Sequence, residues 1–167
     1  MRKAQNATLA SRNYASLASE LISSVGNVEK YGNPLLLEYP EAKKIGVVLV
    51  TTNRGLVGGF NSNLLNKLRD LQLGEPELVA EVISVGKKGA EAVARSKTEL
   101  IAKFTKHDST EQVREIYPVV KMITDQFKTG KYRKILVVYN HFVSTLEQKP
   151  TAKVLLPFNW KEESAKD

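Results

Sequence analysis

The first feature of the chain is a long segment with the apolar spacing of an amphipathic helix. Residues 2–25 contain no glycine or proline, and apolar side chains recur there at three- and four-residue intervals, which places them on one helical face. The stripe consists of Tyr14, Leu17, Leu21 and Val25. Gly26 is well placed to end this helix. Its first turns are polar almost throughout, which favours a helix that begins upstream in the native protein.

The next feature is an almost continuous apolar run at residues 45–52. It is rich in β-branched side chains, the pattern of a strand covered on both faces, so we expect a central parallel strand. A glycine-containing loop follows at residues 53–59, and residues 61–71 then place four leucines on one helical face. Strand, glycine turn and helix together make one βα unit.

A second βα unit is predicted further along the chain. It comprises a strand at residues 80–85, a turn at 86–89 and a short helix at 90–95. A weaker strand pattern follows at residues 100–104. The repeated order of strand, helix and strand favours parallel pairing.

The last third of the chain predicts one more helix and a hairpin. A cap at Ser109 and an apolar stripe predict a helix that ends near Gly130, with a kink where Pro118 removes a ladder donor. The apolar runs at 134–143 and 151–157 read as a hairpin whose final strand is antiparallel. The predicted fold is α/β, a Rossmann-like three-layer sandwich. It has a mostly parallel sheet of about five strands, an antiparallel edge strand and an N-terminal helix.

Composition narrows the function classes. With 167 residues, of which 42% are hydrophobic, the chain can enclose one core, and its length favours a single domain. The absence of cysteine excludes disulfide frameworks, cysteine zinc sites and thiol nucleophiles. A formal net charge of +7 makes an anionic partner such as nucleic acid an alternative to test. The basic residues are nevertheless spread along the chain without a run of five, which is typical of a solvated surface.

The glycine loop at residues 54–59 lies where doubly wound sheets bind phosphates, between a strand and a helix N-terminus. Its spacing matches neither a dinucleotide loop nor a P-loop, and no lysine follows the glycines. One interpretation is a stand-alone nucleotide- or phosphate-binding module. The other is structural: the glycines allow tight turns, while Arg54 or Asn61 holds the loop by hydrogen bonds.

No pattern of catalytic, cofactor-binding or metal-ligating residues is found. The basic turn at residues 86–89 is typical of a solvated strand end. His107 and His141 lie in separate elements without metal-ligand spacing. Leu56 and Val57 stand where a hydrolase elbow would carry its nucleophile. We therefore predict no enzyme activity, no cofactor and no metal site.

Three motifs, taken in order, resemble the gamma subunits of F-type ATP synthases. They are TTNRGLVGGFNSN at residues 51–63, ISVGKKG at 83–89 and VVYNHFVSTLEQKPTAKVLLP at 137–157. The opening RKAQ is similar to the later part of that family's N-terminal helix, so the resemblance runs from about residue 2 to 158. Asn53 stands where the family often has Asp, and Val57 where it often has Cys. The family-motif loop consists of Arg54, Gly55, Leu56, Gly58, Gly59, Phe60 and Asn61.

The resemblance implies a part of the central stalk, or rotor, that has no catalytic site of its own. Residues 1–26 would be the end of the N-terminal stalk helix, 27–158 the globular domain and 159–167 a frayed tail. Family members carry long terminal helices that form a coiled coil, so we interpret this chain as a trimmed domain. The family-motif loop, the turn at Lys87-Lys88 and the flank at 29–39 are expected to contact partners.

The implied partners are the epsilon subunit, the c-ring and the alpha and beta subunits. The implied role is to transmit torque between the membrane ring and the catalytic hexamer. The implied location is the cytoplasmic face of the bacterial inner membrane, as a peripheral complex, or the mitochondrial matrix face in a eukaryote.

Overall fold

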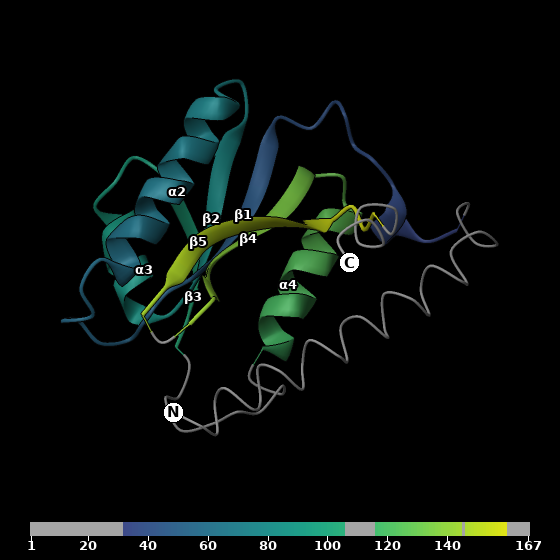
Figure 1. Ribbon diagram of the computed structural model, residues 1–167. Helices are drawn as coiled ribbons and strands as arrows, with labels where there is room; N and C mark the ends of the chain where they lie inside the picture. The colour runs from purple at the N-terminus through teal and green to yellow at the C-terminus, as the bar shows by residue number, and fades with distance from the viewer. Residues whose placement is uncertain (1–31, 106–115, 145, 160–167) are drawn as a thin grey trace. The chain divides into compact units, whose positions relative to one another are not determined.

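The computed structural model describes residues 32–105, 116–144 and 146–159 (Figure 1). The chain divides into two compact units. The larger unit is Glu38–Pro157, and the smaller, flanking unit comprises Met1–Leu37 and Phe158–Asp167. In the flanking unit, a 3₁₀ turn, η1, spans Pro34–Leu36. The backbone N–H of Phe158 donates to the carbonyl of Leu35 at 2.9 Å. The helix predicted at 2–25, the boundary at residue 26 and the tail from 160 lie outside the described residues.

The larger unit is a five-stranded sheet with the strand order β3-β2-β1-β4-β5. Its strands are β1 Lys44–Val50, β2 Val79–Val85, β3 Glu99–Phe104, β4 Tyr132–Phe142 and β5 Gln148–Leu156. Its described helices are α2 Phe60–Gly74, α3 Lys87–Ala94 and α4 Tyr117–Lys128. All neighbouring strands pair in parallel except β5, which is antiparallel to β4. The predicted fold class is confirmed, including the antiparallel edge strand.

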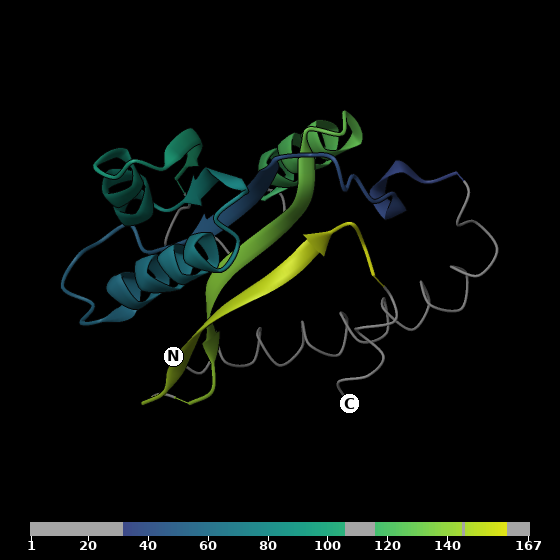
Figure 2. The same ribbon diagram turned by 90° about the horizontal axis from the view of Figure 1, so that it is seen from above.

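The core lies on both faces of the central strand. Alternate β1 residues pack with side chains of α2 and α3 in one apolar cluster, which includes Val47, Leu64 and Val93. Figure 2 shows α2 and α4 on opposite sides of the sheet. On the α4 side, Ile123 and Phe127 are buried, and the Tyr39 ring meets Phe127 edge-on with centroids 5.2 Å apart. Helices therefore cover both faces of the sheet, as its near-continuous apolar β1 strand requires.

Two local predictions were wrong. Pro118 lies in the first turn of α4, where the missing N–H would have no partner within the helix, so it starts the helix and does not kink it. The part of this helix predicted at 109–115 lies outside the described residues. Helix α3 begins at Lys87, and Gly89, which was expected in a turn, is inside the helix and buried. The helix starts three residues earlier than predicted because the tertiary contacts of Gly89 outweigh the low helix propensity of glycine.

Among the described residues, no helix is both long enough and apolar enough to span a bilayer.

Candidate functional site

The family-motif loop joins β1 to α2 at the carboxyl end of the sheet, and its base is closed by hydrogen bonds. The amide of Asn61 donates to Thr52 Oγ1 at 2.8 Å, and the backbone N–H of Thr52 donates to Asn61 Oδ1 at 3.2 Å. Thr52 Oγ1 in turn donates to the carbonyl of Arg54 at 2.6 Å. Asn61 is therefore the side chain that holds the two ends of the loop together.

The residues that precede the loop accept hydrogen bonds from the backbone N–H groups at the N-terminus of α3. The backbone N–H of Lys87 donates to Asn53 Oδ1 at 3.2 Å, that of Lys88 to the Thr52 carbonyl at 3.0 Å, and that of Gly89 to Thr51 Oγ1 at 2.8 Å. These are the groups with which a helix N-terminus would hold a phosphate. Because they already have partners within the chain, this end of α3 is not available as an anion site.

The two glycines of the second motif allow this close approach. Gly86 has φ +108°, and an added Cβ there would overlap the Thr51 carbonyl oxygen. A Cβ on Gly89 would lie 2.7 Å from Thr51 Oγ1 and 2.8 Å from Ser84 Oγ. The motifs TTNRGLVGGFNSN and ISVGKKG are therefore two halves of one structure. No local pattern predicts this contact, because Thr51 and Gly89 are 38 positions apart in the chain.

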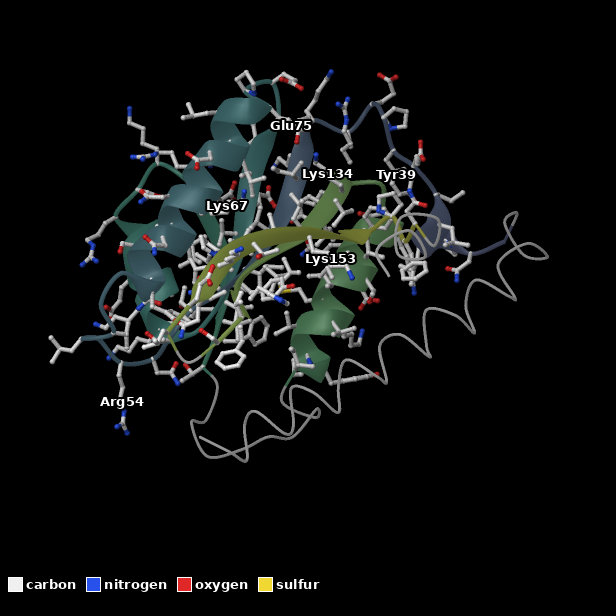
Figure 3. The ribbon with its side chains drawn as sticks, in the orientation of Figure 1. Tyr39, Arg54, Lys67, Glu75, Lys134 and Lys153 are labelled. Atoms are coloured by element: carbon white, nitrogen blue, oxygen red, sulfur yellow. The ribbon has the colours of Figure 1, made fainter. Side chains whose placement is uncertain are left out.

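The tip of the loop projects into solvent. Leu56 is fully exposed and has φ +60°, a region that costs a residue with a Cβ of the order of 1 kcal/mol. Val57 is exposed as well, and Arg54 points away from the sheet (Figure 3). Gly58, at φ +58°, completes the turn. A large apolar side chain is thus held outward on an anchored loop.

A second exposed apolar element lies at the same end of the sheet, because β4 is parallel to β1. The β4–β5 hairpin carries Leu146, which is almost fully exposed, next to the half-exposed Val143. Ser144 Oγ accepts hydrogen bonds from the backbone N–H groups of Leu146 and Glu147 at 3.2 and 3.0 Å. This hairpin was not among the predicted site residues. Two signals could have found it: a leucine within a polar connection, and its place inside the motif at residues 137–157.

The charges beside the loop are mostly local pairs. Lys88 Nζ lies 2.9 Å from Glu91 Oε2 on the same helix, and this hydrogen bond lowers the pKa of Glu91. Within the described ranges, no group of three or more histidine, aspartate or glutamate side chains could hold a metal ion.

Comparison with known proteins decides the family. A family model described as "ATP synthase" matches residues 1–167, the full chain. This chain belongs to the ATP synthase gamma family. The gamma chain of Opitutus terrae is 37% identical over 158 residues, which cover 94% of this chain and 51% of that protein. The gamma chain of Xanthomonas campestris pv. campestris (strain B100) is 31% identical over 162 residues, covering 94% and 56%. The chain thus spans about half the length of these gamma chains.

Solved structures have the same fold. The rotor of the Euglena gracilis mitochondrial ATP synthase has a chain with a TM-score of 0.55 and 20% identity, covering 98% of this chain and 62% of that one. The central stalk and c-ring of the Tetrahymena thermophila enzyme include one with a TM-score of 0.56 and 22% identity, covering 93% and 71%. At these identities the likeness concerns the fold alone.

Proposed function

We propose that this chain is the globular part of a gamma subunit in the central stalk of an F-type ATP synthase. In this role it transmits torque between the c-ring and the catalytic alpha/beta hexamer, and it carries no catalytic residue. The observation that carries the proposal is the family-motif loop, which presents Leu56 outward from a base fixed by Asn61 and Thr52. A torque-transmitting part needs a firmly packed core, which the sheet and its helices supply, and contact surfaces, which the loop would supply.

The names of the similar proteins support this role. The gamma chains are named as chains of ATP synthase, and the structures with the same fold are titled as rotor or central stalk. On this basis the partners are the epsilon subunit, the c-ring and the alpha and beta subunits, and contact with the membrane is made only through the complex. The location is then the cytoplasmic face of the bacterial inner membrane, or the matrix face of mitochondria. Residues 1–26 are proposed to end the stalk helix.

The family-motif loop is proposed as a partner contact. Its polar groups near Thr52 are used within the chain, so the surface left for a partner is the apolar tip at Leu56 and Val57. Because the base of the loop is fixed by hydrogen bonds, little backbone freedom there is lost on binding. We expect Leu56 to contribute most, because it is the most exposed large apolar side chain of the loop.

The test uses the full-length subunit reconstituted with its partner subunits, the c-ring included, into the complete ATP synthase in lipid vesicles. Leu56→Asn keeps a residue that tolerates positive φ and removes the apolar tip. We expect assembly affinity and ATP-driven ion pumping to fall about tenfold. The matched control is Leu73→Asn at the end of α2, a side chain of similar exposure on another part of the unit. Equal behaviour of the two variants would refute the contact role.

A second measurement tests the whole role. The coding DNA on both sides of this segment is expected to encode long, apolar-patterned helices.

Calorimetry tests the alternative of a nucleotide-binding module. The 167-residue chain is expected to bind neither ATP nor ADP, because the N–H groups at the N-terminus of α3 already donate to residues of the chain. Micromolar nucleotide binding would revive the alternative of a nucleotide-binding module.

A further inference from the structure

A buried carboxylate lies at the amino end of the sheet, away from the family-motif loop. Glu81 of β2 is only 1% exposed, and its carboxylate has three partners. Lys44 of β1 donates to Oε1, while Lys131 Nζ lies 2.5 Å and Tyr132 Oη 2.6 Å from Oε2. Burial raises the pKa of Glu81, but the hydrogen bonds from Lys131, Lys44 and Tyr132 outweigh it and lower the pKa to about 2. The group is therefore ionised at neutral pH.

The same side chains reach α4. Gln126 Oε1 lies 3.0 Å from Tyr132 Oη and accepts a hydrogen bond from Lys131 Nζ at 3.2 Å. Lys131 Nζ also lies over the Tyr132 ring, 5.0 Å from its centroid. We name these five side chains, Glu81, Lys44, Lys131, Tyr132 and Gln126, the Glu81 cluster. It connects β1, β2 and β4 to the last turn of α4.

Helix α4 packs on the sheet mainly through the apolar residues Val119, Ile123 and Phe127. Directional contacts at its last turn include the edge-on Tyr39–Phe127 pair and the hydrogen bond from Tyr39 Oη to the Lys128 carbonyl at 3.5 Å. Gln126 adds a directional contact, because its Oε1 accepts a hydrogen bond from Lys131 Nζ only when the last turn of α4 lies close to Lys131. A buried ion pair is weak support for stability, because desolvation offsets its Coulomb energy, but it can select one arrangement over others.

We propose that the Glu81 cluster is a conformational device that fixes the position of α4 on the sheet. The inference rests on the geometry of this unit and does not depend on the rotor role. If the chain transmits torque, the Glu81 cluster keeps α4 in a defined position on the sheet.

The decisive variant is Gln126→Leu in the 167-residue chain. It removes the connection to α4, leaves Glu81 its three partners and keeps helix propensity. Amide hydrogen exchange, measured by mass spectrometry, is expected to become about tenfold faster in α4 than in the native chain and unchanged in α2. An unchanged ratio of the exchange rates in α4 and α2 would overturn the proposal.

Two controls separate positioning from general loss of stability. Asp125→Asn, on the same helix, breaks only the exposed pair with Lys121 and should leave exchange in α4 as it is. Leu68→Val in α2 lowers overall stability without touching the cluster, so it should raise exchange in both helices alike. If Gln126→Leu instead raises exchange in α4 and α2 alike, as Leu68→Val does, the connection to α4 contributes only stability and the proposal fails.

Discussion

The side-chain oxygen of Thr51 accepts a hydrogen bond from the backbone N–H of Gly89 at 2.8 Å, and both residues are buried. This bond joins the end of β1 to the first turn of α3. It also brings the two most distinctive motifs of the chain into direct contact.

Thr51→Val tests this bond. Valine has the same shape but no acceptor, so the buried N–H of Gly89 would lose its partner. We expect the free energy of unfolding to fall by about 2 kcal/mol, measured by urea titration. Thr129→Val is the matched control, because Thr129 Oγ1 donates to Gln126 O at the exposed end of α4 and its loss should have little effect. Equal losses in the two variants would contradict the assigned role of Thr51.

Gly89→Ala tests the close approach of α3 to β1. The added methyl group would lie 2.7 Å from Thr51 Oγ1, and the surrounding side chains are buried and cannot move away easily. We expect a loss of about 2 kcal/mol in the free energy of unfolding, measured by thermal and urea denaturation. Gly74→Ala, at the end of α2, is the comparison, because nothing lies within 4 Å of its added Cβ. It should leave the free energy unchanged or raise it by about 0.5 kcal/mol.

The pKa of Glu81 predicts how stability depends on pH. A carboxyl whose pKa is lowered on folding, here from 4.5 to about 2, stabilises the fold above its unfolded pKa. That contribution, about 3 kcal/mol from 1.36 kcal/mol per unit of pKa, is lost as the pH falls from about 5 towards 2. Urea titrations across this range should show the loss in the native chain and a flatter profile in Glu81→Gln. Parallel profiles would show that other carboxylates account for the acid sensitivity.

Pro118→Ala tests the start of α4. Because proline is tolerated in a first turn, we expect the free energy of unfolding to change by less than about 1 kcal/mol. Thr124→Pro places the same ring in the middle of α4, where it removes a helical hydrogen bond and should cost about 3 kcal/mol or more. Circular dichroism with urea titration gives both values. A large loss from Pro118→Ala would indicate that this proline has a tertiary role.

The sequence by itself determined the class of the fold. The apolar run at 45–52 specified a strand buried on both faces, and the leucine spacing of 61–71 specified the helix after it. These signals are local, since the period of apolar residues sets which face of an element is buried. The motif at 51–63 pointed to the family in the same way, because its glycine spacing is contained in one short segment.

The tertiary structure alone decided which distant groups meet. Gly89 bonds to a residue 38 positions away, and Tyr132 bonds to Glu81, 51 positions away. Strand order and register set these contacts, and no periodic pattern encodes them. The start of α4 at Tyr117 shows the same limit, since Pro118 is compatible with a kink or with a first turn and only the packed chain selects between them. The local spacing of apolar residues thus determined the helices and strands. The non-local packing of buried polar groups determined the contacts of the family-motif loop and of the Glu81 cluster.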